Sequence, residues 1–514
     1  MAMPKDLIAV LDFGGQYSHL ITRRVRECEV YSELLPYTLT AQDILKLKTK
    51  GIILSGGPAS VYEENAPKCD PGIFRLGIPV LGICYGLQVM VQMLGGRVKT
   101  TKRREYGKTQ LNIIDHSDLF QGINSPIASW MSHGDYAETL PDGFEIIASS
   151  ENCKTAAIRD PSRRLYGVQF HPEVVHTENG LEIIRNFATK TSACSQSWNP
   201  KSIIETAVQL IRSEVGDADV LSAVSGGVDS TTTAVLVQRA VGARLTSIFV
   251  NHGLLRKDEE KIVLRALRDN LKLNVHYVDA SERFLKRLQS VADPEQKRRI
   301  IGEEFIKVFD EESSKIGSFR WLVQGTLYPD VIESAGTGSI AARIKTHHNV
   351  GGIPEWSRFR ILEPLRFLYK DEVRKIAREL GIPDAIVKTH PFPGPGLAVR
   401  IVGELTEEKI RICRDASAIV EEVLVNHGLY DSVWQAFAIV GDDLVVGVLG
   451  DQRKLAHVVT VRIVKSLDGM TADWARISPD ILEELSSRIT GEVPGVTWVT
   501  YAITSKPPST IEPG

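Results

Sequence analysis

Three side chains that together could hydrolyse an amide stand in the first part of the chain, and the first of them is Cys84. It lies in Gly82–Gly86 (GICYG), after an apolar run of strand length, Pro79–Ile83, and before a helical pattern, Leu87–Leu94. A nucleophile on such a strand-to-helix turn exposes its reactive atom, and the helix N-terminus beside it favours the thiolate. The pattern predicts Cys84 as a nucleophile and the N–H of Tyr85 as one oxyanion donor.

A histidine and a glutamate two positions apart supply the other two members. His171 and Glu173 lie in Gly167–Glu173 (GVQFHPE), and alternate residues of an extended segment point to the same side. Glu173 can then hold one tautomer of His171, the general base. Another glycine turn after a strand, Ser55–Pro58 (SGGP), offers the N–H of Gly57 as the second oxyanion donor. A lone cysteine is usually a core residue and a lone histidine usually structural, but this combination favours a catalytic triad.

A glycine-rich turn in the middle of the chain has a different chemistry. Ser225–Ser230 (SGGVDS) follows the apolar run Val220–Val224 and precedes the helical pattern Thr231–Ala240. Backbone N–H groups and the positive end of the helix dipole converge in such a turn, which makes it an anion site rather than an ordinary turn. It is not a Walker A motif, since no lysine follows the glycines in register. Asp229 indicates a Mg²⁺ ion beside a phosphate.

The predicted phosphate contacts are Ser225, Gly226, Gly227, Val228, Asp229, Ser230 and Thr231. Gly226 and Gly227 allow a positive φ and a close approach of the ligand. The hydroxyl groups of Ser225, Ser230 and Thr231 add donors to those of the backbone.

The composition describes a soluble globular protein and excludes several other classes. The chain has 514 residues, enough for about three domains, with 43% hydrophobic and 24% charged residues. A net charge of −3 gives no reason to expect nucleic-acid binding, and no apolar run is long enough for a membrane span. Six cysteines without a CxxC pair predict neither a disulfide framework nor a cysteine zinc site. With no signal-peptide pattern, we expect a cytoplasmic protein.

The catalytic turns need rigid elements to hold them, and the apolar pattern predicts an α/β fold. Short apolar runs alternate with helical patterns, which is typical of two doubly wound domains with mainly parallel sheets, followed by a small α+β domain. The polar segment Thr191–Lys201 reads as a linker, and His390–Gly396 (HPFPGPG) breaks all periodicity. The predicted domains are 1–195, 196–389 and 390–514.

Two family resemblances follow from these motifs. Gly82–Gly86, Ser55–Pro58 and Gln169–Glu173 resemble the class I (triad) glutamine amidotransferases, which hydrolyse glutamine through a cysteine thioester and release ammonia. That resemblance implies that Gln88, together with His133 and Asp135 of the turn Ser132–Asp135 (SHGD), holds the glutamine; otherwise the segment is merely a β-turn. The loop Ser225–Ser230 resembles the pyrophosphate loop of N-type ATP pyrophosphatases, which cut ATP between the α and β phosphates.

An ammonia source joined to an ATP pyrophosphatase implies one overall chemistry. ATP adenylates a carbonyl oxygen of an acceptor, and ammonia then displaces AMP. Direct transfer is needed because free ammonia is mostly ammonium at neutral pH and is then not nucleophilic. The two motifs leave the acceptor open.

The rest of the chain is similar from end to end to the glutamine-hydrolysing GMP synthetase family. The matching segments are Arg298–Gly302 (RRIIG), Gln324–Asp330 (QGTLYPD), His347–Gly352 (HHNVGG), Lys388–Arg400 (KTHPFPGPGLAVR), Gly450–Arg453 (GDQR) and Thr504–Pro508 (TSKPP). The resemblance implies that xanthosine monophosphate (XMP) is the acceptor, adenylated at O2 and attacked by ammonia at C2. It also implies Mg²⁺ with ATP, no tightly bound organic cofactor, and a homodimer formed through the C-terminal domain.

Further site residues are implied by the same resemblance. Arg298, Asp451, Lys506 and Glu512 are expected to bind XMP. Lys388 is expected to stabilise adenylate or phosphate charge, and fold analogy places the adenine near the backbone of Val250. The segment Ile344–Gly352 would be a lid over ATP rather than a zinc site, because adjacent histidines point to opposite faces and no third ligand is evident. Asp330 is a second candidate near Mg²⁺.

The chain departs from the family pattern at two places. It ends Ile511–Gly514 (IEPG), which keeps Glu512 but lacks the family's usual Trp-Glu ending, and Ala502 stands where the family often has Asp. Three other readings remain: a related ligase with a different acceptor, a non-catalytic nucleotide sensor, and a tRNA-thiolating enzyme. The intact Cys84, His171 and Asp229 argue against the second, and the net charge and missing CxxC pair argue against the third.

Overall fold

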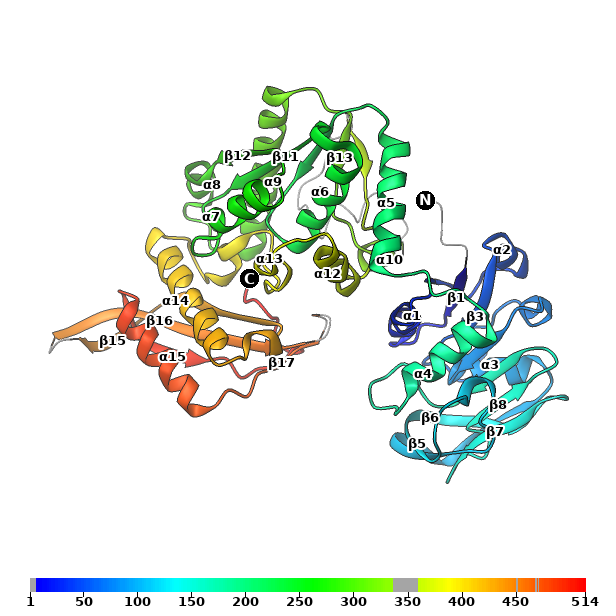
Figure 1. Ribbon diagram of the computed structural model, residues 1–514. Helices are drawn as coiled ribbons and strands as arrows, with labels where there is room; N and C mark the ends of the chain where they lie inside the picture. Colours follow the sequence, from blue (N-terminus) through cyan, green and yellow to red (C-terminus); the bar gives the residue numbers. More distant parts are fainter. Residues whose placement is uncertain (1–5, 336–358, 450–451, 467–468, 470) are drawn as a thin grey trace. The chain divides into compact units, whose positions relative to one another are not determined.

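Figure 1 shows the computed structural model, which describes residues 6–335, 359–449, 452–466, 469 and 471–514. The chain folds into two compact units, Met1–Ile203 and Ile204–Gly514. The predicted domain boundaries after residues 195 and 389 stay predictions. No helix among these described residues has the length and apolar character needed to span a membrane.

A nine-stranded sheet forms the centre of the first unit. Its strands are β1 (Leu7–Asp12), β2 (Ser32–Pro36), β3 (Thr49–Leu54), β4 (Val80–Ile83), β5 (Arg97–Ile113), β6 (Ile127–Thr139), β7 (Glu145–Ser150), β8 (Ala157–Asp160) and β9 (Leu165–Val168). Their order across the sheet is β2-β1-β3-β4-β9-β8-β7-β5-β6. Neighbours from β2 to β9 pair in parallel, whereas those from β9 to β6 pair antiparallel. The predicted α/β class is confirmed.

The helices of the first unit are short, and α1 and α2 connect strands of the parallel part. They are α1 (Ser18–Glu27), α2 (Ala41–Lys46), α3 (Tyr85–Met93) and α4 (Gly180–Arg185), with single turns at Pro71–Arg75, Asp118–Phe120 and Asn186–Thr191. The strands β1, β3 and β4 are almost wholly buried and read as continuous apolar runs, as expected of parallel strands covered on both faces. The chain therefore turns from β4 into α3 at the carboxyl edge of the sheet, where Cys84 lies.

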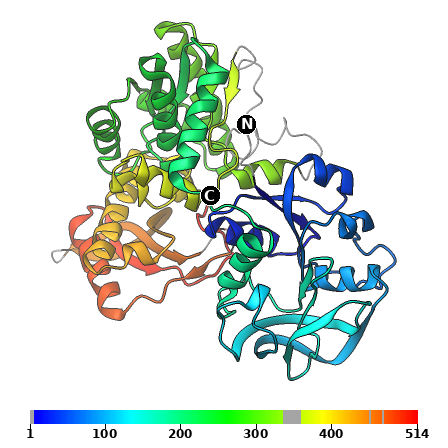
Figure 2. The ribbon, with the colours of Figure 1, turned by 45° about the vertical axis from the view of Figure 1, so that its right-hand side comes forward.

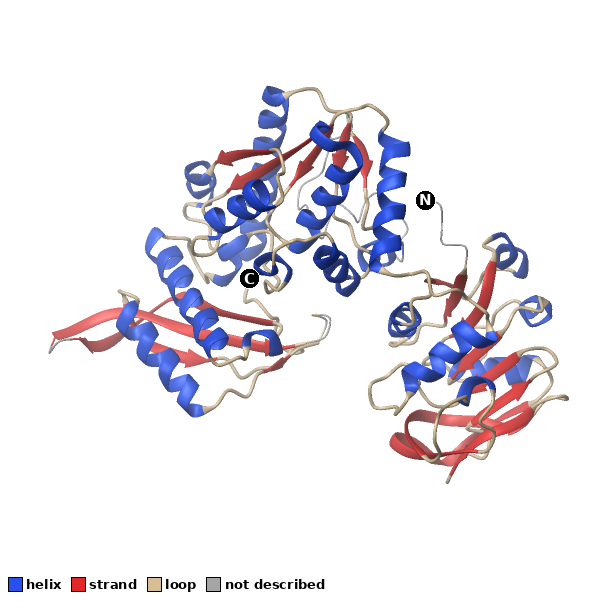
Figure 3. Ribbon diagram, in the orientation of Figure 1, coloured by secondary structure: helices blue, strands red, loops and turns tan. Residues whose placement is uncertain are grey.

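The second unit begins with a five-stranded parallel sheet. Its strands are β10 (Val220–Ala223), β11 (Leu245–Asn251), β12 (Val275–Asp279), β13 (Trp321–Val323) and β14 (Arg360–Leu362). The order β12-β11-β10-β13-β14 reverses direction after β10, so the connections lie on both faces, as Figure 3 shows. Ligands of doubly wound sheets bind where the strand order reverses, at the carboxyl ends of the strands. The loop Ser225–Ser230 leaves β10 at that point.

The helices of the second unit are longer. They are α5 (Pro200–Val215), α6 (Val228–Val241), α7 (Glu259–Leu264), α8 (Ser281–Leu288), α9 (Pro294–Ile316), α10 (Tyr328–Ala335), α12 (Lys370–Glu379), α13 (Asp384–Val387), α14 (Glu407–Asn426) and α15 (Pro479–Glu492). Short turns lie at Gly242–Arg244, Arg265–Asn270, Gly396–Arg400 and Tyr430–Ser432. Capping side chains define two of the long helices: Asp293 accepts from the N–H of Gln296 before α9, and Thr406 accepts from the N–H of Lys409 before α14.

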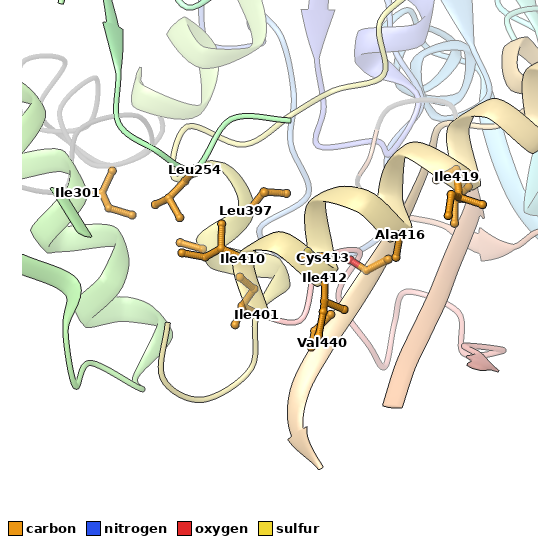
Figure 4. Packing of buried hydrophobic residues seen from close by; sticks show 14 of the residues in the cluster. Leu254, Ile301, Leu397, Ile401, Ile410, Ile412, Cys413, Ala416, Ile419 and Val440 are labelled. Carbon is orange, nitrogen blue, oxygen red and sulfur yellow. Dashed lines mark hydrogen bonds between the residues drawn. The ribbon is translucent and has the colours of Figure 1, made fainter. Parts of the chain in front are cut away.

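A second sheet of four strands closes this unit. It consists of β15 (Gln435–Leu449), β16 (Gln452–Lys465), β17 (Asp473–Trp474) and β18 (Val496–Tyr501), with β16 pairing with the other three. Helices α14 and α15 lie together on one face of it (Figure 1 and Figure 2). The core is continuous with that of the parallel part, because Leu254, Ile301 and Leu397 belong to the same buried cluster as Ile410 and Val440 (Figure 4).

Candidate active sites

Cys84 occupies a sharp turn between β4 and α3, as the glycine-flanked pattern predicts. Its backbone angles, φ 51° and ψ −105°, are unusual for a residue with a side chain, and strained positions of this kind cluster at active sites. It caps the N-terminus of α3, so the N–H of Tyr85 is among the helix donors that have no partner within the helix. The side chain is only 6% exposed, but it faces a cavity of about 560 Å³.

The two glycines beside this turn are required by close contacts. A Cβ atom on Gly82 would lie 2.6 Å from the backbone nitrogen of Leu87, and one on Gly86 would lie 2.3 Å from the carbonyl oxygen of Leu54. Neither contact is possible for a real side chain. The GICYG pattern therefore exists because only glycine lets α3 begin so close to β3 and β4.

His171 and Glu173 form the buried pair that the sequence predicts. The Nδ1 atom of His171 is 2.7 Å from Oε1 of Glu173, whose side chain is fully buried. Burial disfavours the imidazolium, but the carboxylate of Glu173 and the hydrogen bond to the Cys84 side chain outweigh it and raise the pKa of His171 well above its ordinary range. The imidazole thus has one nitrogen held by Glu173 and interacts with the sulfur.

The cavity brings the other predicted residues of this site together. Its lining includes Gly57, Cys84, Tyr85, Gln88, His133, Asp135 and His171. Both predicted oxyanion donors, Gly57 and Tyr85, therefore border the space that the sulfur faces. A Cβ on Gly57 would lie 2.9 Å from the carbonyl oxygen of Phe13 and 3.1 Å from the ring of Tyr85, so the approach of these two turns depends on glycine.

Asp135 is fixed by neighbours that the sequence did not reveal. Its Oδ2 accepts from the hydroxyl of Ser60 at 2.7 Å, and its Oδ1 accepts from the hydroxyl of Thr100 at 2.7 Å. The Nε2 of Gln88 donates to the backbone carbonyl of Asp135 at 2.8 Å. The prediction that Ser132–Asp135 is a turn is wrong: the segment lies within β6, because it pairs with β5 across an irregular stretch of that strand.

His133 is held by a buried acidic group. Its Nε2 is 3.1 Å from Oε2 of Glu105, which also accepts from the hydroxyl of Ser150 at 2.9 Å. The side chains of Glu105, His133 and Cys153 offer ligand atoms within 4.8 Å of one another, a spacing compatible with a metal ion. Burial raises the pKa of Cys153 to about 11, however, which disfavours the thiolate that a metal requires. This network is better explained as a support for His133.

The glycine-rich loop in the second unit has the form of an anion site. Gly227 is the N-cap of α6, without a capping side chain, and Gly226 has a φ of 80°. The hydroxyls of Ser225 and Ser230 lie 3.1 Å apart and bond mainly within the loop. The hydroxyl of Thr231 is buried and has no partner in the part of the chain that the structure describes. The free donors of the helix N-terminus are thus available for a phosphate.

Asp229 and Lys370 form a charged pair beside this loop. The Nζ of Lys370, the first residue of α12, is 3.2 Å from Oδ2 of Asp229. The other oxygen of Asp229, Oδ1, is buried and has no hydrogen-bond partner among the described residues. Gly325, after β13, comes close enough that a Cβ there would lie 3.7 Å from the backbone of Ser230. The site is therefore built from segments that are far apart in the sequence.

Three further predicted residues have other contacts here. Lys388 forms an ion pair with Asp384 at 3.1 Å, one turn earlier in the chain. Asp330 accepts through Oδ2 from the N–H of Leu327 at 2.9 Å, at the start of α10. Val250 is buried in β11, where its backbone pairs with β12. Their predicted roles toward ATP and Mg²⁺ stay predictions.

Two of the four predicted XMP contacts meet at the chain's last segment. Arg298, on α9, donates to the carbonyl of Gly514. Glu512 accepts from Nε2 of Gln435 at 2.8 Å and lies 3.9 Å from the guanidinium of the buried Arg400. Lys506 donates to the carbonyl of Gly469 at 2.9 Å.

Two other predictions concern residues that the structure does not describe. Asp451 and the segment Ile344–Gly352 lie outside the described residues. The predicted XMP contact of Asp451 and the predicted lid therefore stay predictions.

Sequence reasoning missed several residues that support these sites. Lys370 begins an ordinary amphipathic helix, and Ser60, Thr100 and Glu105 lie in segments without a motif, so no local signal marked them. Gln169 is different, because it stands inside the GVQFHPE segment and could have been considered from that position alone.

Comparisons with known proteins agree with this geometry. Residues 9–191 match the family described as glutamine amidotransferase class-I, and residues 422–513 match the family described as GMP synthase C terminal domain. A protein named GMP synthase (glutamine-hydrolyzing) from Synechocystis sp. is 54% identical over 514 residues, which covers 99% of this chain and 95% of that protein. A protein of the same name from Caldanaerobacter subterraneus is 54% identical and covers all of both chains. A third, from Thermosynechococcus vestitus, is 53% identical over 99% of this chain and 97% of that protein.

Proposed function

Since the chain belongs to the glutamine-hydrolysing GMP synthases, we propose that it aminates XMP to GMP with ammonia released from glutamine. ATP adenylates O2 of XMP and releases diphosphate, and ammonia then attacks C2 and displaces AMP. One observation supports this most strongly. A strained cysteine with a buried His–Glu pair occurs in the same chain as the glycine-rich loop Ser225–Ser230, which leaves helix N–H donors available for a phosphate. Either feature alone would fit many other enzymes.

The first half-reaction is proposed to proceed on Cys84. Its thiolate attacks the side-chain carbonyl carbon of glutamine, and the N–H groups of Gly57 and Tyr85 stabilise the oxyanion. The imidazolium of His171 gives its proton to the leaving nitrogen, so ammonia and a thioester result. His171 then takes a proton from water, which attacks the thioester and releases glutamate and the thiolate. Glu173 keeps the imidazole oriented through both steps.

The substrate contacts of this half-reaction are proposed from charge and position. Asp135 lines the cavity with a carboxylate that is already oriented by two hydroxyl groups, which suits the α-ammonium of glutamine. Gln88 and His133 border the same space and can contact the remaining polar groups. The cavity volume of about 560 Å³ is sufficient for an amino acid.

The second half-reaction is proposed to use the loop Ser225–Thr231. Its N–H groups and hydroxyls would bind the departing diphosphate, and Lys370 would add a positive charge there. The residues also fit Mg²⁺: the buried Oδ1 of Asp229 has no partner within the described ranges and is the hard oxygen ligand that this ion prefers. When bound, Mg²⁺ would neutralise phosphate charge during adenylation.

The acceptor is proposed to bind near the last segment of the chain. Arg298 can contact an anionic oxygen of XMP, and Glu512 can accept from a ring N–H or a ribose hydroxyl. Arg298 bonds to Gly514, and Glu512 lies two positions earlier in the same last segment. Lys506 and Asp451 are proposed contacts by family resemblance alone.

We also propose a homodimer through the outer part of the ribbon formed by β15 and β16. Leu444, Val446, Val448 and Leu455 are each more than half exposed, and Val446 faces Leu455 in register. Such an apolar face is typical of an obligate interface.

Val446→Lys combined with Leu455→Lys should convert a dimer to a monomer in analytical ultracentrifugation. Val425→Lys, at an exposed valine on α14, should not. A wild-type monomer at all concentrations would exclude the dimer.

The decisive experiment compares two nitrogen donors. XMP-to-GMP conversion is measured with Mg²⁺-ATP for wild type and for Cys84→Ala, each with glutamine or with ammonium. We expect wild type to use both donors and the variant to use ammonium only. If wild type makes no GMP from either donor, the acceptor assignment fails, and a related ligase with another adenylated acceptor becomes the better reading.

A further inference from the structure

Gln169 is a fully buried amide beside the sulfur of Cys84. It follows directly after β9, two residues before His171. Its Nε2 lies 3.6 Å from Sγ of Cys84, a distance suitable for an N–H donor and a sulfur acceptor. Its Oε1 accepts from Nε2 of Gln88 at 3.3 Å. Both polar ends of this side chain therefore contact residues of the glutamine-hydrolysing site.

The orientation of the two amides is determined by the backbone. The carbonyl oxygen of Asp135 can only accept a hydrogen bond, so the atom of Gln88 that faces it at 2.8 Å must be the nitrogen. That nitrogen also faces Gln169, which must therefore present its oxygen to Gln88. The nitrogen of Gln169 is then the end that points at Cys84, and it can only donate.

We infer that Gln169 is a positioning residue that donates a hydrogen bond to the sulfur of Cys84 and so favours its thiolate form. The inference rests on the proposed role of Cys84 as the nucleophile. Gln169 acts through that sulfur rather than by contact with the substrate. Through Gln88 it is also linked to Asp135, so the strand that would recognise glutamine is connected to the nucleophile by consecutive hydrogen bonds.

The neighbours of the sulfur show why a donor matters there. The carbonyl oxygen of Ser132 is 3.7 Å from Sγ and can only accept, so it stabilises the protonated thiol. The thiolate has lost most of its water contact, because Cys84 is almost fully buried, and needs donors from the protein. His171 supplies one as the imidazolium, and Gln169 supplies a second that remains a donor at every pH.

The other charged and titratable groups around the sulfur are the same in wild type and in a variant at Gln169. Those that line its cavity are Tyr17, Glu63, Tyr85, Arg104, Tyr106, His133, Asp135 and His171, with Glu105 behind His133 and Glu173 behind His171. A change at Gln169 replaces none of them. An altered pH response of Cys84 in such a variant would therefore report the lost amide donor.

The test follows the alkylation of Cys84 by iodoacetamide as a function of pH, read by mass spectrometry on the full chain. Gln169→Met keeps the length of the side chain but removes the donor, and Gln169→Glu keeps the shape and adds a negative charge. Gln92→Met, half-buried on α3 outside the cavity, is the matched control. We expect the pH midpoint of alkylation to rise by about one unit in Gln169→Met, the equivalent of about tenfold less thiolate, and further in Gln169→Glu.

Activity assays separate this inference from the proposed function. Glutamine-dependent GMP formation should fall about tenfold at neutral pH in Gln169→Met, and ammonium-dependent formation should be unchanged. Wild-type midpoints in both variants would overturn the inference and leave Gln169 as a packing residue. Glutamine-dependent activity in Cys84→Ala would instead overturn the proposed function.

The other buried cysteines report the fold of each variant. Burial raises the pKa of the other four cysteines of the first unit, Cys28, Cys69, Cys153 and Cys194, so we expect them to stay unreactive while that unit is intact. Their alkylation in Gln169→Met would show that this variant has opened. In that case Gln169→Glu, which preserves the volume and an acceptor for Gln88, decides the question. An unchanged midpoint in that variant would again overturn the inference.

Discussion

In the first unit the reacting side chains are already bonded to one another, whereas in the second unit the loop Ser225–Thr231 has two buried groups without partners among the described residues. Oε2 of Glu173 is an exception in the first site, because it is also buried without a hydrogen-bond partner among the described residues. His171 has its carboxylate, Asp135 has two hydroxyl donors, and the sulfur of Cys84 has Gln169 and His171. Around the loop, by contrast, Oδ1 of Asp229 and the hydroxyl of Thr231 are buried and accept or donate no hydrogen bond among the residues that the structure describes. A buried polar atom without a partner costs free energy, of the order of 1–3 kcal/mol.

This difference follows from what each site must do. Glutamine hydrolysis needs groups whose protonation states are set before substrate arrives, and the protein itself supplies the partners that set them. In the proposed adenylation, ATP and Mg²⁺ would arrive together and would satisfy the groups left free. The first site should therefore be sensitive to loss of internal partners, and the second to loss of groups that face the ligand.

The largest expected effect is that of Glu173→Gln, which tests the contrast between the two sites. The change keeps the shape but removes the charge that orients His171 and raises its pKa. Loss of the equivalent carboxylate in a serine triad costs about 10⁴ in rate, and a cysteine depends on its base less, so we expect a fall of about 10³ in glutamine-dependent GMP formation. Ammonium-dependent formation, measured in parallel, should keep its wild-type rate. A similar fall with both donors would contradict the separation of the sites.

The next effect concerns Lys370. Replacing it with Met removes the cation beside the phosphate loop but leaves the stem, and loss of one such electrostatic contact typically costs about 10² in rate. We expect that fall with glutamine and with ammonium alike, because both need the adenylated acceptor. Lys375→Met, at an exposed lysine on the same helix α12, is the matched control and should retain activity. Equal activities of the two variants would mean that Lys370 only pairs with Asp229.

The sequence predicted the parts of each site that are contiguous in the chain. The turn around Cys84, the pair His171–Glu173 and the loop Ser225–Thr231 could be found because strained turns demand glycine and local spacing. The helical pattern of Glu407–Asn426 likewise forms one continuous helix, α14. Local patterns of this kind record backbone constraints directly.

The partners that come from elsewhere in the chain could not be predicted. Lys370 reaches Asp229 across 141 positions, and Thr100 reaches Asp135 only because β5 pairs with β6. The antiparallel half of the nine-stranded sheet also depends on pairing between strands, and there β5 to β9 follow one another without an α-helix between them. The segment Ser132–Asp135 contains glycine and reads as a turn, but pairing with β5 makes it a strand.

The smallest expected effect concerns the protonation of a buried histidine, which differs between the two units. Where Glu173 favours the charged form of His171, burial lowers the pKa of His252, at the end of β11, to about 4. Its Nδ1 accepts from the N–H of Leu254 at 3.1 Å, which only the neutral ring can do. An unfolded histidine titrates near pH 6.5, so between pH 6.5 and about 4 the unfolded segment binds a proton that the folded one does not.

The free energy of local unfolding around His252 should therefore be highest above about pH 6.5. It should decline as the pH falls toward 4, by up to roughly 3 kcal/mol. His252→Asn keeps an acceptor for Leu254 and cannot titrate, so its stability should be nearly independent of pH in that window. Hydrogen exchange of the segment from Asn251 to Leu255, corrected for the intrinsic pH dependence of exchange, measures this locally, with the exposed His427→Asn as control. Parallel pH slopes for wild type and His252→Asn would show that His252 is not held neutral. Burial would then not set the charge of His252 in the way that Glu173 sets that of His171.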